Sequence, residues 1–206
     1  ELLRRRAFVL HSHDGAATFS APRFVTEACG PPGFATAALV LHRGAGPVSG
    51  AERLTHICNA AGGSGVLATT SRDGSAELWS DVVPVHPPLA DGVSGRVRAA
   101  AARDDGHLGI LYTTRERRGD ARCYDVHFVL STDGGVTFHA PHRLSLDTYC
   151  PTRADNGATV DSWPDGGDYY GIAVDARGRF RLVWSDARSG RFQLYATTIE
   201  PPVARP

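Results

Sequence analysis

The stretch that decides the fold of this 206-residue chain reads Ser131-Thr-Asp133-Gly134-Gly135-Val-Thr137-Phe138. A serine and an aspartate two residues apart can bond the backbone amides of the turn that they start. Glycine at the tip of the turn accepts a positive φ angle, and the aromatic residue after it can anchor the returning strand. An apolar run, residues 126–130, precedes the stretch. The stretch therefore predicts a tight turn between two antiparallel strands.

Two other segments repeat this pattern. They read Ser12-His-Asp14-Gly-Ala-Ala-Thr18-Phe19 and Ser71-Arg-Asp73-Gly-Ser-Ala-Glu-Leu-Trp79. The first has Ala16 in place of the second glycine. The other has Ser75 there, lacks the threonine and carries one extra residue before Trp79. The three serines, at positions 12, 71 and 131, give a constant period of about 60 residues, and such a period is typical of a repeat architecture.

The composition indicates many short strands. The chain has 23 Gly and 13 Pro, which recur between short apolar runs and favour tight turns. No sustained helical period is present, and each repeat has room for four strands, which is the content of one propeller blade. We therefore expect an all-β fold of four-stranded antiparallel units with no long helix.

The three segments resemble the Asp-box, Ser-x-Asp-x-Gly-x-Thr-aromatic, of bacterial neuraminidase (BNR) repeats in the sialidase-like superfamily. The run from Gly167 to Tyr195 resembles the closing blade of many such proteins. The resemblance implies a β-propeller, with about three blades of a six-bladed ring in this chain. It makes the motif residues structural, and these are Ser12, Asp14, Phe19, Ser71, Asp73, Trp79, Ser131, Asp133, Gly135, Thr137 and Phe138.

The blade register divides a single partial propeller domain, residues 1–206, into successive parts. These are a blade end (1–26), two blades (27–86 and 87–145), a last blade (146–200) and a tail (201–206). Thirteen strands are expected, at 5–11, 18–25, 35–42, 53–59, 65–70, 79–85, 97–103, 108–114, 124–130, 137–144, 170–175, 180–186 and 192–199. An arc of this size leaves unpaired edges, so we expect an upstream part of the chain or a partner to supply the other blades.

The resemblance places a functional face on the side opposite the Asp-boxes. Sialidases clamp the carboxylate of their sugar with three arginines, and Arg115, in an expected loop at 115–123, occupies a similar place. Arginine suits this role because its planar guanidinium binds a carboxylate through two hydrogen bonds. Arg117, Arg188 and Asp186 complete the substrate-binding candidates. The alternative is a solvated loop held by internal ion pairs.

The catalytic candidates are Tyr169 and Tyr170, because sialidases use a tyrosine nucleophile that stands at the start of an inner strand. A tyrosine also packs well at a strand entrance, which is the structural alternative. Sialidases need a glutamate to activate that phenol, and residues 96–103 hold none. The sequence thus supports the sialidase fold more than the sialidase reaction. An exo-glycosidase of exo-α-sialidase type, a non-enzymatic propeller that binds a glycan or a protein, and a structural blade set all stay open.

Charge and composition limit the classes of partner that the chain is expected to bind. The formal net charge is zero, which gives no electrostatic footprint for nucleic acid, and no apolar run is long enough to span a membrane. A glycan or glycoconjugate is the expected partner, without a cofactor. Carboxylates at Asp161, Asp165 and Asp168 could bind Ca²⁺, although a polar turn explains them as well.

The four cysteines form two local pairs in this register. Cys29 and Cys58 lie in one blade, and Cys123 and Cys150 in the next, all toward the same face. We expect the bridges Cys29–Cys58 and Cys123–Cys150, with four buried thiols as the alternative. Disulfides persist in oxidising compartments, so the bridges would indicate a secreted or periplasmic protein.

Overall fold

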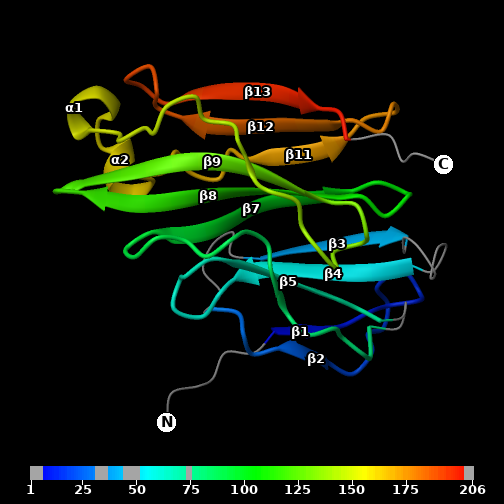
Figure 1. The fold of residues 1–206 in the computed structure, drawn as a ribbon. Helices are drawn as coiled ribbons and strands as arrows, with labels where there is room; N and C mark the ends of the chain where they lie inside the picture. The colour runs from blue at the N-terminus through cyan, green and yellow to red at the C-terminus, as the bar shows by residue number, and fades with distance from the viewer. Residues whose placement is uncertain (1–6, 31–36, 44–51, 73–75, 202–206) are drawn as a thin grey trace, which may run out of the picture.

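The computed structural model describes residues 7–30, 37–43, 52–72 and 76–201. Within these ranges the chain is all-β apart from two one-turn helices, and its four antiparallel sheets follow one another along the chain. The sheets lie one above the other, from β1 and β2 at the N-terminal end to β13 near the C-terminus (Figure 1). The first strands of three sheets are neighbours in the stack, since β7 packs against both β3 and β11.

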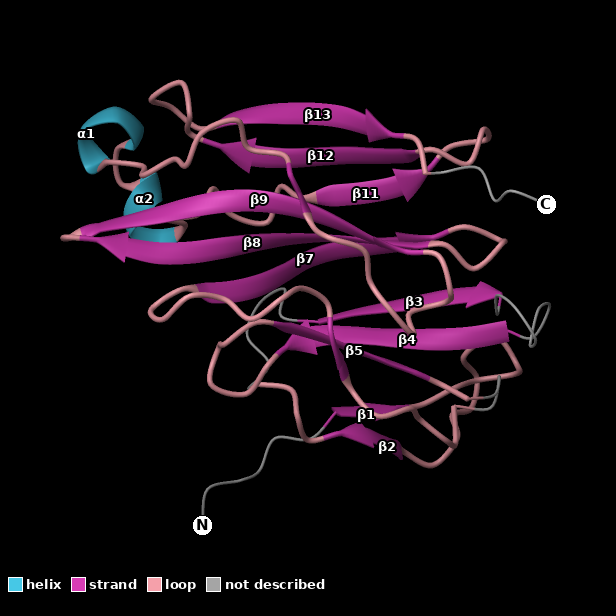
Figure 2. Ribbon diagram, in the orientation of Figure 1, coloured by secondary structure: helices cyan, strands magenta, loops and turns pink. Residues whose placement is uncertain are grey.

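Thirteen strands of the described residues make up the four sheets, and Figure 2 shows how little helix accompanies them. The first sheet pairs β1 (Ala7–Val9) with β2 (Arg23–Thr26). The second contains β3 (Ala37–Arg43), β4 (Glu52–Asn59), β5 (Val66–Thr70) and β6 (Val83–Pro84). The third contains β7 (Ser94–Ala102), β8 (Leu108–Arg118), β9 (Ala121–Ser131) and β10 (His142–Arg143). The last contains β11 (Gly171–Val174), β12 (Phe180–Asp186) and β13 (Gln193–Ile199).

The strand after each Ser-x-Asp segment is shorter than the sequence predicts. The expected strands 18–25, 79–85 and 137–144 reduce to β2, β6 and β10, of two to four residues. Each of these segments contains a proline: Pro22, Pro84 or Pro141. Proline has no N–H to donate to a ladder, so only a short stretch of each edge strand can pair.

The first and third Ser-x-Asp segments form the same hydrogen-bond network. The Asp133 carboxylate accepts from the Thr137 amide (2.9 Å) and the Thr137 hydroxyl (2.5 Å). The Asp14 carboxylate accepts from the Thr18 amide (2.9 Å) and the Thr18 hydroxyl (2.7 Å). In both segments the serine hydroxyl donates to the aspartate and accepts an amide from the tip of the turn.

Backbone geometry in the two turns also agrees. Gly134 and Gly135 have φ angles of 76° and 87°, and Gly15 and Ala16 have φ angles of 69° and 70°. Ala16 therefore adopts a left-handed conformation in which a Cβ is strained. In the middle segment, Asp73 lies outside the described residues, while Ser71 and Trp79 form an isolated β-bridge.

The aromatic residues that end these segments differ in burial. Phe138 packs into the core between the second and third sheets, and Trp79 packs into the core between the first and second. Each thus contacts the sheet that precedes its own. Phe19, at the same position of the first segment, is 61% exposed. Phe138 and Trp79 are therefore packed against the core, whereas the Phe19 ring is open to solvent among the described residues.

Two disulfides are present, and they join the pairs that the sequence predicts. Cys29 is bonded to Cys58, and Cys123 is bonded to Cys150.

The helices α1 (Arg153–Asn156) and α2 (Thr159–Ser162) follow the second bridge, in the segment that leads to β11. None of the helices within the described ranges is long and apolar enough to cross a membrane.

Acid should destabilise the fold through His127 on β9. The Tyr112 ring stacks with both His86 and His127, with ring centroids 5.0 Å apart in each pair. Burial lowers the pKa of His127 from 6.5 to about 4. The unfolded chain then binds the proton more readily than the folded chain, so this stabilisation is complete above pH 6.5 and is lost as the pH falls toward 4.

The expected loss from His127 over that window is about 2 to 3 kcal/mol of unfolding free energy. Urea unfolding between pH 7.5 and pH 4 measures it, with His127→Gln as the comparison. Burial also lowers the pKa values of His42, which is buried, and His56, which is half-buried, and these two contribute equally to both proteins. Parallel pH profiles for the two proteins would show that His127 is not the cause.

Candidate functional site

A cavity of about 710 Å³ opens where β7 begins and β8 ends. The turn after β4 forms one wall, and the segment between α2 and β11 forms the opposite wall. The residues that line it are Asn59, Gly63, Ser94, Gly95, Arg96, Arg98, Thr113, Arg115, Tyr124, Ser162, Trp163, Pro164, Asp165, Gly167 and Asp168. Three arginines and two aspartates are thus the charged groups of the lining.

Two of the arginines lie on β7, and one of them stands at a β-bulge. Arg96 pairs with Thr113 and Val97 with Tyr112, but the next pair is Ala99 with Leu111, so Arg98 is an extra residue. A bulge inserts one unpaired residue and redirects side chains locally. Alternation along the strand puts Arg96 and Arg98, two residues apart, on the same side, and both line the cavity. Arg115 enters it from the neighbouring strand.

Arg98 is the most deeply placed of the three. Its side chain is only 2% exposed, and its guanidinium lies 4.4 Å from the centroid of the Tyr170 ring. The Nε donates to the Thr113 hydroxyl at 3.0 Å, and Nη2 donates to the Asp165 carboxylate. Nη1 is buried with no hydrogen-bond partner among the described residues. A buried cationic donor without a partner is costly, which makes it a candidate for contact with a ligand.

Asp165 balances part of this positive charge. It accepts from Arg98 and from Arg96 Nη1 (3.1 Å), and its side chain is 12% exposed. Burial opposes its ionisation, but the attraction of Arg98 and then Arg96 outweighs burial and holds the Asp165 pKa below its ordinary value. Burial and repulsion by Arg98 lower the pKa of Arg96. The cavity therefore keeps an ionised Asp165 and an excess of guanidinium groups.

Aromatic side chains border the charged part of the cavity. Tyr124 lies on β9 opposite Arg115 and is buried against Tyr149, with ring centroids 5.6 Å apart. Trp163 lines the cavity yet is 56% exposed. Gly167 separates two exposed rings, since a Cβ on it would lie 3.5 Å from Tyr169 and 3.7 Å from Trp163. An aromatic rim therefore lies beside the arginines.

The expected loop at 115–123 is wrong. Arg115, Arg117 and Arg118 belong to β8, which pairs with β9 up to the two-residue turn at Gly119 and Asp120. Gly119 has a φ of 61°, as a tight hairpin turn requires. Arg115 lines the cavity, whereas Arg117 lies further along the hairpin and does not. Arg115 and the Ser131–Thr137 segment are at opposite ends of the β8–β9 ladder.

Neither tyrosine candidate lines the cavity. Tyr169 is 69% exposed. The Tyr170 hydroxyl donates to the main-chain carbonyl oxygens of Asp165 (2.8 Å) and Ser185 (3.2 Å), and it lies 3.3 Å from the Tyr149 hydroxyl. Burial raises the pKa of Tyr170 despite the nearby Arg98. A phenol that is held protonated and turned to carbonyl oxygens is a poor nucleophile.

Arg188 and Asp186 form a packed cluster outside the cavity. Asp186 is fully buried at the end of β12 and accepts from Arg188 and from Trp184 Nε1 at 3.0 Å. The Arg188 guanidinium lies 4.2 Å from the centroid of the Tyr195 ring. These contacts pair the two residues with each other and with aromatic rings, which explains them as parts of the core.

The three aspartates proposed for calcium have other partners or positions. Asp165 is paired with Arg96 and Arg98, and Asp161 lies 3.4 Å from Arg153. Asp168 is exposed and lines the cavity. Ion pairs with arginine thus account for the positions of Asp165 and Asp161.

Sequence reasoning missed Arg96, Arg98 and Tyr124. The two arginines stand at the start of residues 96–103, a run that otherwise consists mainly of alanine. Two arginines two residues apart at the start of an apolar strand indicate a site with a charged partner. Burial of a charge on such a strand costs free energy unless an opposite charge pairs with it. Residues two apart on a strand also share a face, so the sequence could have grouped the two arginines.

No protein-family model and no curated protein sequence matches the chain. Among solved structures, it is similar to an endo-arabinase from Bacteroides thetaiotaomicron, at 17% sequence identity and a TM-score of 0.38. The similarity covers 74% of this chain and 53% of the arabinase chain, so the chain spans about half the length of that structure. A likeness at this level carries no inference about activity.

Proposed function

We propose that the cavity binds a carboxylate-bearing sugar and that the chain is a glycan-directed, sialidase-like protein. The observation that carries the proposal is the meeting of Arg96, Arg98 and Arg115 in one cavity, with Arg98 Nη1 buried and unpaired. A carboxylate supplies two acceptor oxygens in the geometry of the guanidinium fork. Asp165 and Asp168 leave one positive charge in excess among the charged lining residues, which favours an anion.

The aromatic rim fits the rest of such a ligand. A sugar ring has apolar C–H faces and polar edges, and binding sites commonly combine aromatic surface with a few placed polar groups. Trp163 offers an exposed ring at the mouth of the cavity, and Tyr169 offers another beside Gly167. In this proposal Tyr169 is part of the binding surface.

The surrounding frame is, in this proposal, a partial Asp-box propeller whose sheets are successive blades. Support comes from the matching networks at Ser12–Thr18 and Ser131–Thr137, and from the β7 contacts with β3 and β11. The exposed Phe19 ring gives further support for the propeller. Phe138 and Trp79, at the same position of their segments, each pack on the preceding sheet. A further sheet, from upstream chain or a partner, would cover the exposed Phe19 ring in the same way.

Hydrolysis is not part of the proposal. The Tyr170 phenol has a raised pKa and donates to carbonyl oxygens, and Tyr169 is not in the cavity lining. The binding alternative is therefore favoured over an exo-sialidase mechanism. Two disulfides fit a secreted or periplasmic protein, which is where extracellular glycans are met.

Replacement Arg115→Gln should weaken binding of an acidic sugar by about 10- to 100-fold, the loss of one charge-assisted hydrogen-bonded contact. Calorimetric titration with N-acetylneuraminic acid and glucuronic acid, against glucose, measures it. Arg117→Gln is the matched control, since Arg117 is on the same strand outside the cavity. Equal affinity of the wild-type protein for glucose and for both acidic sugars would refute the proposal.

A further inference from the structure

Arg117 and Arg122 face each other across the outer end of the β8–β9 hairpin. The register pairs them directly, and both are exposed. Residues directly opposite in an antiparallel pair have Cβ atoms about 4.5–5.5 Å apart, and like charges there are destabilising. No carboxylate of the described residues forms an ion pair with either guanidinium, so the hairpin carries an uncompensated pair of positive charges.

These two arginines lie on the same face of the hairpin as the cavity. Side chains alternate along a strand, so Arg117 projects on the same side as Arg115, two residues earlier. Arg122 stands in the same relation to Tyr124 on β9. Arg115 and Tyr124 line the cavity. Arg117 and Arg122 therefore lie just outside the cavity, about 6.8 Å along the strands from Arg115 and Tyr124.

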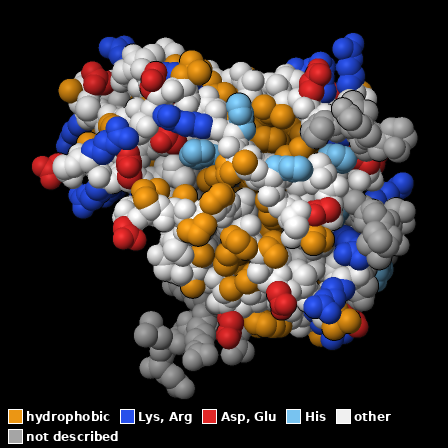
Figure 3. Space-filling view, viewed as in Figure 1, with side chains coloured by type: hydrophobic (Ala, Val, Ile, Leu, Met, Phe, Trp, Pro, Cys, Tyr) orange, Lys and Arg blue, Asp and Glu red, His pale blue; other side chains and the backbone are white. Residues whose placement is uncertain are grey.

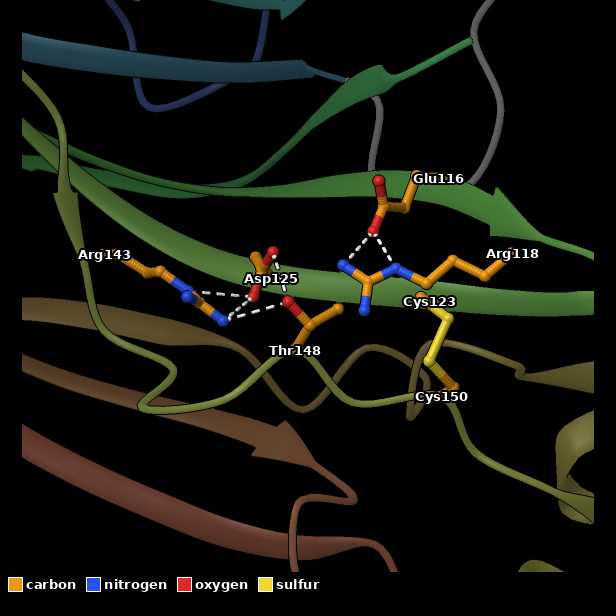
Figure 4. Close-up of a disulfide and its surroundings, with 7 residues drawn as sticks. All are labelled: Glu116, Arg118, Cys123, Asp125, Arg143, Thr148 and Cys150. Atoms are coloured by element: carbon orange, nitrogen blue, oxygen red, sulfur yellow. Dashed lines mark hydrogen bonds and ion pairs between the residues drawn. A yellow bond between two sulfur atoms is a disulfide. The ribbon is translucent and has the colours of Figure 1, made fainter. Parts of the chain in front are cut away.

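The other face of the hairpin is neutralised. Glu116 accepts from Arg118 Nε at 2.5 Å, and this ion pair cancels the two charges on that side (Figure 4). Figure 3 shows charged side chains of both signs at the projecting end of β8 and β9, and hydrophobic side chains gathered nearer the middle of the view. A chain of zero net charge thus presents a local positive excess beside its cavity.

We propose that Arg117 and Arg122 form a second anion-binding site, which holds the next acidic unit of an oligomeric acidic glycan whose neighbouring unit occupies the cavity. The inference rests on the proposed function and narrows its ligand from an acidic monosaccharide to a polyanionic glycan. An anionic group between the two guanidiniums would accept from both and would remove their mutual repulsion. Two anion sites one short step apart match a ligand with a carboxylate on each successive unit.

A nucleic acid is the rival polyanion, and the site favours the glycan. Asp165 and Asp168 lie among the arginines of the cavity lining, whereas nucleic-acid binding proteins carry an extended basic patch. The adjoining cavity is of small-ligand size and is bordered by Trp163 at its mouth. Single-stranded DNA is therefore the competing probe in the test.

The test compares an acidic monosaccharide with its oligomer in the full chain. Tetra-N-acetylneuraminic acid should bind the wild-type protein at least about 10-fold more tightly than N-acetylneuraminic acid, by the effective concentration of a second linked contact. The double variant Arg117→Gln/Arg122→Gln should lose that gain and keep the monosaccharide affinity. Arg118→Gln, on the neutralised face, is the control and should keep both affinities.

The outcomes separate this inference from the proposed function. Monosaccharide binding with no gain for the tetramer, or a gain retained in the double variant, overturns the second site and leaves the cavity proposal standing. Tetramer binding that the double variant loses, without any monosaccharide binding, supports the second site and counts against the cavity. Tighter binding of single-stranded DNA than of the tetramer overturns the glycan assignment. Removal of two facing like charges should also leave the melting temperature unchanged or raised, and a fall would make the pair structural.

Discussion

Reduction of both disulfides should lower the free energy of unfolding by about 7 kcal/mol, because each bridge closes a loop that contributes about 3.5 kcal/mol in the chain-entropy model. The two loops span 29 and 27 residues. Domains of this kind are stable by about 5–15 kcal/mol, so the reduced chain should be close to unfolding at room temperature. Urea unfolding with and without a phosphine reductant measures the change.

The two bridges should differ in their effect on the cavity. Cys123 lies near the start of β9, and Cys150 lies in the segment that continues through α1 and α2 to the cavity wall. Figure 4 shows Asp125 beside this bridge, where its carboxylate accepts from Arg143 (2.9 Å) and Thr148 (3.1 Å). This network holds the same segment to β9.

We therefore expect Cys123→Ser/Cys150→Ser to weaken binding of an acidic sugar more than Cys29→Ser/Cys58→Ser does, at similar costs in stability. A loss of less than 1 kcal/mol in either double variant would mean that the reduced chain retains the constraint by other contacts. Free thiols in the protein purified from its natural source would count against an oxidising compartment.

Local chemistry made most of the fold predictable. The Ser-x-Asp spacing fixed the period, and strands such as 180–186 were foreseen to the residue because apolar runs end at clear turn formers. The cysteine pairs followed from that register, since bridges need neighbouring loops. The errors fell where an element is decided by its partner strand. Residues 115–118 are polar and look like a loop, but β9 continues to pair with them.

The set of residues that line the cavity could not be predicted from the sequence. Arg98 is the unpaired residue of β7, and its partner Asp165 lies 67 residues later in the chain. Tyr170 was foreseen at a strand entrance, but its neighbours there are the carbonyl oxygens of Asp165 and Ser185. Such contacts depend on how one sheet packs on the next, and the pattern of residues along the sequence does not predict them.

Replacement Asp165→Asn should cost about 3–5 kcal/mol of unfolding free energy, because it leaves Arg98 as an uncompensated buried charge. The Arg98 side chain is 2% exposed, and Asp165 is its carboxylate partner. Burial disfavours a charged guanidinium, and attraction to Tyr170 and Asp165 holds the Arg98 pKa above its ordinary value. Asparagine keeps the shape of the side chain and removes the charge, so packing changes little. Asp168→Asn is the matched control, since Asp168 is exposed in the same segment, and it should change stability by less than about 0.5 kcal/mol.

A double-mutant cycle isolates the pair itself. Arg98→Met removes the buried charge and keeps an apolar stem, and Asp165 retains Arg96 as a partner. In the Arg98→Met background, Asp165→Asn should therefore cost much less than it does in the wild-type protein, with a coupling free energy of about 1–3 kcal/mol. Urea unfolding at pH 7 gives the four free energies. A coupling near zero would show that Arg98 is stabilised by Thr113 and the Tyr170 ring alone, and that Asp165 serves the cavity only by its charge.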